Sequence, residues 1–113
     1  MLRFLEPCLL FLLRSGEAHG YKLLSEIGRF GFNPEQLDPS LLYRALREME
    51  AAGWVESHWD AEAAQGPKRR VYALTELGKG QLRRWVEDLE STRDEIDSLL
   101  KAYRGKGAAE DGR

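Results

Sequence analysis

Side chains suited to nucleic acids gather in one stretch of the sequence, residues 38–53. Arginine, tyrosine and serine are residue types that contact the phosphates and base edges of DNA. Four of them fall on one side of a predicted helix, and they are Ser40, Tyr43, Arg44 and Arg47. The start of a helix adds a partial positive charge that attracts phosphate. The stretch therefore predicts a DNA-contacting helix, although an ordinary amphipathic helix with a solvated face would show the same pattern.

A second cluster of positive charge consists of Lys68, Arg69 and Arg70. The segments 54–59 and 70–74 alternate aromatic and β-branched residues, and the polar stretch between them contains the breaker Gly66-Pro67. This pattern predicts a β-hairpin. A basic hairpin that follows a helix-turn-helix is typical of a winged helix, and the hairpin (the wing) would bring its cations to a phosphate backbone or a minor groove.

The helix over residues 38–53 has signals at both of its ends. Asp38 is a typical N-cap, Pro39 suits the first helical position, and Gly53 provides a left-handed stop. Its apolar residues recur at the spacing of one helical face, and we expect that face to be buried. They are Leu42, Ala45, Leu46 and Met49.

Two shorter helices are predicted upstream, over residues 7–14 and 21–29. Pro7 suits the first turn of the first helix, and Gly16 ends it. Asn33-Pro34 marks a loop before the central helix. The expected fold is therefore mainly α with a small β-hairpin, a winged helix-turn-helix followed by a long C-terminal dimerisation helix.

The last predicted helix begins at Thr75, a natural N-cap, and extends to about Arg104. Some of its side chains recur at alternating steps of three and four residues, the a/d pattern of a coiled coil. This seam consists of Leu82, Trp85, Leu89, Thr92, Ile96, Leu99 and Tyr103. A small domain cannot cover most of a seam of this length. We therefore expect the helix to pack on a second copy of itself and form a homodimer. The predicted parts are 1–74 (DNA-binding domain), 75–104 (dimerisation helix) and 105–113 (disordered tail).

Composition limits the classes of protein that this chain resembles. It has 113 residues, of which 42% are hydrophobic, and this suits one globular domain. No apolar run reaches the roughly 18 residues of a membrane span, so a cytoplasmic protein without membrane contact is expected. The net charge of −2 means that DNA binding must rely on local basic clusters.

The sequence predicts neither catalysis nor a bound cofactor. No nucleophile with its base, glycine-rich phosphate loop or carboxylate pair is recognisable. Cys8 stands alone in an apolar run, which excludes an internal disulfide and favours an inert thiol. His19 and His58 are too few to predict a metal site. His19 is expected to be a local structural partner.

The motifs together resemble the PadR family of bacterial transcriptional regulators over about residues 9–78. Each motif alone is unspecific, but their order and spacing are specific. The matching residues are His19-Gly20-Tyr21, Leu42-Tyr43, Leu46-Arg47, Glu50, Gly53, Gly66-Pro67-Lys68-Arg69-Arg70, Tyr72, Leu74-Thr75 and Gly78. The short length, with one C-terminal helix, is similar to the smaller branch of the family, in which the last helix serves dimerisation.

The resemblance implies a homodimeric, sequence-specific repressor on double-stranded DNA, with a two-fold symmetric operator. The third helix would lie in the major groove and the wing near the minor groove or backbone. Tyr43 matches the family's tyrosine on that helix, and Lys68 and Arg69 match its basic wing. Tyr21 matches a second-helix tyrosine, whose position favours a core role over a contact to the DNA backbone.

The sequence departs from the family pattern in three places, and these departures put the DNA target in doubt rather than the fold. Ser40-Leu41 replaces a frequent Gly-Thr or Gly-Ser, Arg44 a frequent proline, and Val71 a frequent wing aromatic. An exposed Leu41 would contact a thymine methyl group or belong to a protein-facing surface. The alternative function is therefore a winged-helix module for protein–protein contact without operator binding, which the acidic balance also favours.

Trp85 takes a d position of the seam, where leucine is usual. The indole either fills a gap in the packing or, as in some PadR-like proteins, helps to wall a gap between two subunits. Such a gap would accept a small planar aromatic effector by stacking.

Overall fold

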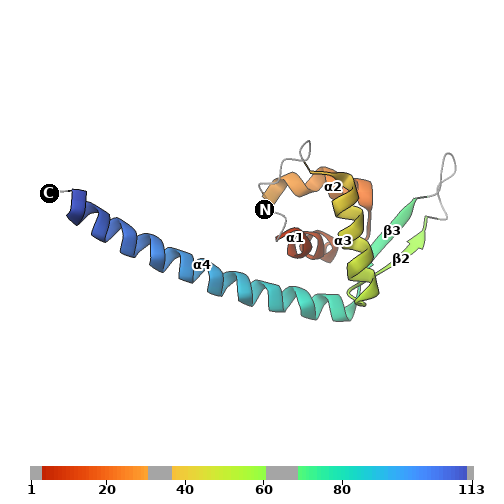
Figure 1. Ribbon diagram of the computed structural model, residues 1–113. Helices are drawn as coiled ribbons and strands as arrows, with labels where there is room; N and C mark the ends of the chain where they lie inside the picture. The colour runs from red at the N-terminus through yellow and green to blue at the C-terminus, as the bar shows by residue number, and fades with distance from the viewer. Residues whose placement is uncertain (1–3, 31–36, 61–68, 112–113) are drawn as a thin grey trace. The chain divides into compact units, whose positions relative to one another are not determined.

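The computed structural model describes residues 4–30, 37–60 and 69–111, and only the backbone of residues 106–111. Its elements are α1 (Leu5–Arg14), β1 (Ala18–His19), α2 (Gly20–Glu26), the 3-10 helix η2 (Ile27–Phe30), α3 (Pro39–Ala51), β2 (Val55–Trp59), β3 (Arg70–Leu74) and α4 (Glu76–Asp111) (Figure 1). The chain divides into two compact units, residues 1–82 and 83–113. Within the described ranges, no helix is both long and apolar enough to cross a membrane.

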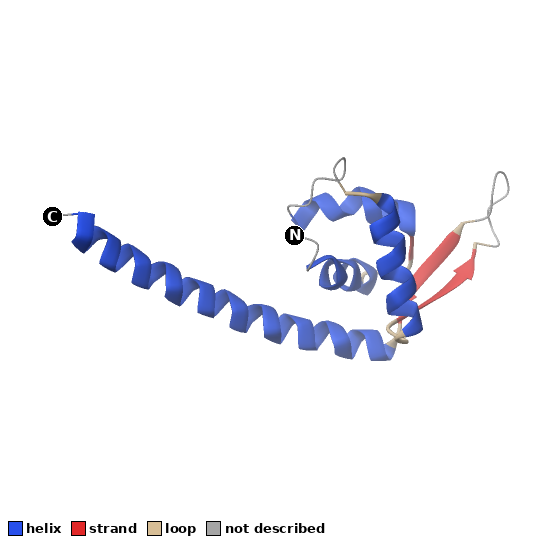
Figure 2. Cartoon of the chain, in the orientation of Figure 1, coloured by secondary structure: helices blue, strands red, loops and turns tan. Residues whose placement is uncertain are grey.

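The three strands form one antiparallel sheet in the order β1-β3-β2 (Figure 2). In register, Tyr72 of β3 lies between Ala18 and Ser57, and Val71 lies between His19 and His58. The sequence predicted the β2–β3 hairpin but not β1. A strand of two residues is too short to show an alternating pattern, so only the fold reveals it.

Helices α1, α2 and α3 supply most of the hydrophobic core of the first unit, and the sheet completes it. The largest fully buried side chains are Leu9, Leu10, Leu23, Ile27, Leu42, Leu46, Met49 and Val55. Three of the four residues on the predicted inner face of α3 are buried, and Ala45 is half-buried. The apolar pattern therefore identified the core side of this helix correctly.

Both predicted end signals of α3 are confirmed. The Asp38 carboxylate accepts a hydrogen bond from the Ser40 backbone N–H at 2.9 Å, and this bond holds the pKa of Asp38 below its usual value. At the other end Gly53 has φ +84° and donates to the carbonyl of Glu50, while the Trp54 N–H donates to the carbonyl of Met49. This pair of bonds is a Schellman motif, which requires the left-handed residue.

Helices α1 and α2 differ from their predicted bounds. Helix α1 begins at Leu5 rather than Pro7, since a proline is tolerated within the first turn. Helix α2 ends at Glu26, and the chain then tightens into η2, where Gly28 lowers the helical preference. The predicted loop at Asn33-Pro34 lies outside the described residues.

Thr75 caps α4, as predicted. Its Oγ1 accepts a hydrogen bond from the Gly78 N–H at 3.0 Å and donates one to the carbonyl of Gly53 at 2.6 Å. The sequence predicted a disordered tail over residues 105–113. Helix α4 instead continues through residues 105–111. An existing helix adds residues more easily than it nucleates, and alanine, lysine and glutamate favour its continuation. The first turns of α4 belong to the compact unit of residues 1–82, beyond the boundary predicted at residue 74.

The environment of Cys8 agrees with an inert thiol. The side chain is half-buried, and burial raises its pKa to about 11. Because the thiolate is the nucleophilic form, this group stays protonated and unreactive near neutral pH.

Candidate nucleic-acid interface

The outer face of α3 presents the polar residues that the sequence placed there. Ser40, Arg44 and Arg47 are exposed, and Tyr43 is half-buried. Arg44 Nε lies 3.4 Å from Glu48 Oε1, an exposed pair one helical turn apart that contributes little stability and leaves the guanidinium accessible. Leu41 was predicted to be exposed, but it is half-buried and offers less surface to a partner.

Tyr43 lies against the first residue of α2, Gly20. A β-carbon built on Gly20 would collide with Cε1 of the Tyr43 ring and approach Cζ to 3.0 Å. The missing side chain of this glycine therefore makes room for the phenol of α3. The sequence marked Gly20 only as part of the motif His19-Gly20-Tyr21, because a contact between two helices leaves no local signal.

A cleft of about 360 Å³ lies between the start of α2, helix α3 and the start of β3. Its lining is His19, Gly20, Tyr21, Tyr43, Arg69 and Arg70. Tyr21 is 72% exposed. This exposure corrects the core role that its position favoured: Tyr21 lies in the first turn of α2, where Leu23 rather than Tyr21 faces the core. Two phenols and two guanidiniums thus meet at a solvent-accessible site.

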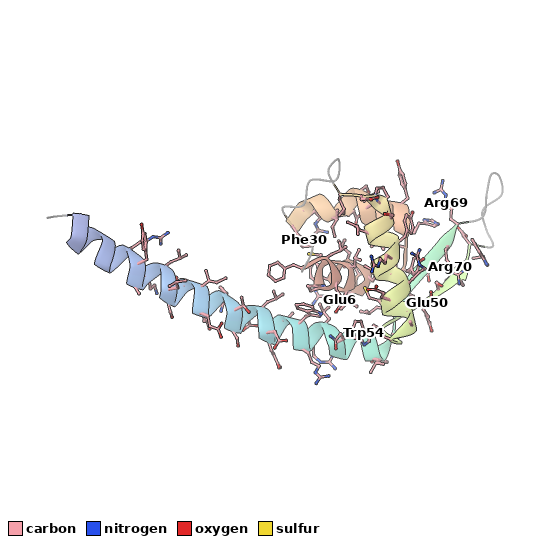
Figure 3. The ribbon with its side chains drawn as sticks, viewed as in Figure 1. Glu6, Phe30, Glu50, Trp54, Arg69 and Arg70 are labelled. Carbon is pink, nitrogen blue, oxygen red and sulfur yellow. The ribbon has the colours of Figure 1, made fainter. Side chains whose placement is uncertain are left out.

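The described part of the wing ends next to this cleft. The Asp60 N–H donates to the carbonyl of Arg69 at 2.7 Å and joins the two arms of the hairpin. Figure 3 labels Arg69 and Arg70 at the start of β3, and Arg70 lies between the sheet and α3. The predicted wing residues Lys68, Gly66 and Pro67 lie outside the described residues.

Both histidines lie beside carboxylates at the wing. His19 Nε2 is 3.2 Å from Asp60 Oδ2, and His58 Nε2 is 4.0 Å from Glu17 Oε1. In each pair, one residue lies in or next to β1 and the other lies in or next to β2. These two strands are the neighbours of β3 in the sheet. His19 therefore has a structural partner, but this partner is Asp60, 41 residues away in the sequence, rather than a local one near the helix start as predicted. The pair supports the part of the wing nearest to the cleft.

Charges of both signs surround the buried phenol of Tyr72 on β3. Burial raises its pKa, and the Glu50 carboxylate raises it further, while Arg70 and Arg47 lower it. Of these charged residues, Glu50 is half-buried, whereas Arg47 and Arg70 are exposed. The more accessible charges around Tyr72 are therefore positive, as a phosphate backbone requires.

Comparison with known proteins identifies the family to which this winged-helix chain belongs. The model of the transcriptional regulator PadR-like family matches residues 9–84, which include most of α1, all of α2, α3 and the sheet, and the start of α4. The chain belongs to this family. Its members are DNA-binding transcriptional regulators and not enzymes, in agreement with the function class that the sequence predicts.

The PadR-like chain is similar to proteins from several bacteria. It is 31% identical over 112 residues to the negative transcriptional regulator PadR of Bacillus subtilis, covering 90% of this chain and 57% of that protein. It is 26% identical over 97 residues to an uncharacterised protein of Lysinibacillus sphaericus, covering 86% and 88%. The crystal structure of a PadR-like regulator from Bacillus cereus matches with a TM-score of 0.72 and 27% identity, covering 86% of this chain and 91% of that chain.

The residues of the predicted seam become more exposed along α4 of the PadR-like chain. Leu82 is only 7% exposed in the single chain and belongs to the first unit, so it has little surface left for a second copy. Trp85, Leu89 and Thr92 are half-buried. Farther along α4 the seam is exposed, with Ile96 at 52%, Leu99 at 69% and Tyr103 at 72%.

Proposed function

We propose that this PadR-like regulator is a repressor that binds a two-fold symmetric operator as a homodimer. In this proposal α3 enters the major groove, and the wing contacts the minor groove or the backbone. The observation that carries it is the cleft where Tyr21, Tyr43, Arg69 and Arg70 meet beside the exposed arginines of α3.

The roles of the interface residues follow from their positions. Arg44 and Arg47 project from a helix whose width fits the major groove, and arginine pairs with guanine there through two hydrogen bonds. Ser40 and Leu41 lie in the first turn, nearest to the backbone or to a thymine methyl group. Tyr21, Lys68 and Arg69 would flank the groove and contact phosphates.

The exposed seam of α4 supports the homodimer. Ile96, Leu99 and Tyr103 recur at steps of three and four residues, and each is more than half exposed. An apolar stripe of this spacing is stabilised when a second helix covers it. A two-fold dimer would present two copies of α3 and therefore favour a palindromic operator.

Repression is supported by the Bacillus subtilis relative, which is a negative transcriptional regulator. We place the activity in the cytoplasm, where bacterial DNA is accessible to a regulator. The alternative, a protein-binding winged helix, was favoured by an exposed Leu41. Because Leu41 is half-buried, that support is weaker.

Selection of bound sites from a random DNA pool tests the proposal. We expect one enriched motif with two-fold symmetry, bound less tightly as the salt concentration rises, because bound cations release counterions from DNA. A pool without an enriched motif, together with salt-independent binding of a protein partner, would favour the alternative.

Arg69→Ala is expected to weaken binding to all DNA sequences alike. An exposed arginine at the wing mainly contacts phosphate. The slope of log affinity against log salt should become less steep by about 0.9 for each lost phosphate contact, so by about 1.8 for a dimer. Titrations at several salt concentrations measure this slope. A change of preference at one base pair, with the slope kept, would instead make Arg69 a base-reading residue.

We extend the proposal to a planar aromatic effector at Trp85. If two indoles wall a gap near the two-fold axis, such a molecule would stack there, and it would lower DNA affinity only by binding the DNA-incompetent spacing more tightly. Titration with planar dyes should quench indole fluorescence in the wild type and much less in Trp85→Ala, which keeps Trp54 and Trp59. Equal quenching in both proteins would leave Trp85 as packing.

A further inference from the structure

Arg69 and Arg70 are neighbours in the sequence, but Arg70 is engaged within the protein. Its Nε donates a hydrogen bond to Ser57 Oγ at 2.8 Å, and its guanidinium lies 5.0 Å from the centre of the Trp59 ring. Both arginines are exposed, but Arg69 shares neither contact. The two arginines therefore have different freedom to meet DNA.

The contact of Arg70 continues to the end of α3. Ser57 Oγ donates a hydrogen bond to Glu50 Oε2 at 2.6 Å. A serine hydroxyl has one proton to donate and lone pairs to accept, so Ser57 can join a cationic donor to an anionic acceptor. The chain Arg70–Ser57–Glu50 thus links β3, β2 and α3, and Figure 3 labels its two charged ends, Arg70 and Glu50.

This link connects the two parts of the interface that must reach DNA together. Glu50 follows Arg47 by less than one helical turn, and Arg70 directly follows Arg69 at the start of β3. Hydrogen bonds with charged partners are shorter and stronger than neutral ones, and stacking on an indole further restricts a guanidinium. These contacts therefore hold strands β2 and β3 of the wing against the recognition helix, α3.

We propose that Glu50, Ser57 and Arg70 are positioning residues that set the wing against the recognition helix, and that Arg70 neutralises no DNA phosphate. This inference rests on the proposed function, and it changes the role that the sequence assigned to Arg70. Ordering the wing before DNA arrives reduces the entropy lost on binding, so the link raises affinity without touching DNA.

Salt titrations with a labelled duplex carrying the selected operator separate positioning from phosphate contact. Ser57→Ala and Arg70→Ala should each weaken binding about fivefold to tenfold, as expected for one hydrogen bond, with the salt slope of the wild type kept. Arg70→Lys should lose as much affinity as Arg70→Ala, because an ammonium group lacks the Nε–H and the planar fork. Arg69→Ala is the matched control, in which the slope becomes less steep.

The opposite pattern would overturn the proposal. If Arg70→Lys bound like the wild type, Ser57→Ala had no effect and Arg70→Ala reduced the slope as Arg69→Ala does, Arg70 would be a phosphate contact. Unchanged affinity in all three variants would overturn it as well.

A measurement without DNA keeps this test separate from the proposed function. In a double-mutant cycle on urea unfolding, Ser57→Ala and Arg70→Ala should be non-additive, because each removes the same hydrogen bond. Additive effects would refute the link even if the wild type binds an operator. If the two substitutions were non-additive but the protein bound no DNA, the proposed function would be refuted. The link would then exist without a role in DNA binding.

Discussion

Replacing Ile96 and Leu99 together by aspartate is expected to give monomers that no longer hold the operator. Both side chains are more than half exposed on α4 and belong to the proposed seam. Dimer formation would bury four added carboxylates, which is strongly unfavourable. A monomer binds one half-site only, so we expect operator affinity to fall by about 100-fold or more. Sedimentation equilibrium and an operator titration measure the two effects.

A matched variant keeps the added charge but leaves the seam intact. Ser91 and Ser98 are exposed on α4 outside the a and d positions. Ser91→Asp with Ser98→Asp should therefore remain dimeric and bind DNA with only a modest loss. An intact dimer in the Ile96→Asp and Leu99→Asp protein would show that the subunits meet through another surface.

Gly78→Ala is expected to lower the free energy of unfolding by about 3 kcal/mol, at the upper end of overpacking effects. A β-carbon at Gly78 would collide with the carbonyl oxygen of Trp54 and lie 2.6 Å from Leu74 Cδ1. A backbone carbonyl cannot move aside as a side-chain end can. The first turn of α4 would shift, and the hydrogen bond from the Gly78 N–H to Thr75 would be strained.

Gly105→Ala is the control in the same helix. A β-carbon there meets nothing within 4 Å, so alanine should stabilise by about 0.5–1 kcal/mol through its higher helix propensity. Urea unfolding at one fixed protein concentration compares the variants, since dimer stability depends on concentration. If Gly78→Ala were as stable as the wild type, the close approach of α4 to Trp54 would be wrong.

The interface was predictable where a residue's role depends on its own helix or strand. The spacing of Leu42, Leu46 and Met49 identified the buried side of α3 and so placed Arg44 and Arg47 outside. The basic run next to β3 likewise predicted the cationic end of the wing. These inferences need only the period of a helix and the length of a hairpin.

Roles that depend on a distant partner were missed or misassigned. Tyr21 was favoured as core but lines an open cleft, because its exposure depends on how α2 packs on α3 and β3. Leu82 fits the seam by spacing, yet the first unit already buries it. Arg70 looked equivalent to Arg69 in the sequence, and only the pairing of β2 with β3 brings it to Ser57.

Local preferences, periodicity and motif order were enough to predict the four α-helices, the caps of α3 and α4, the hairpin and the family. The tertiary structure alone decided that β1 joins the sheet, that Gly20 makes room for Tyr43, and that Glu50, Ser57 and Arg70 form one link. Each of these is a contact between residues far apart in the chain. Such contacts depend on the packing of whole elements, and a local pattern contains no record of that packing.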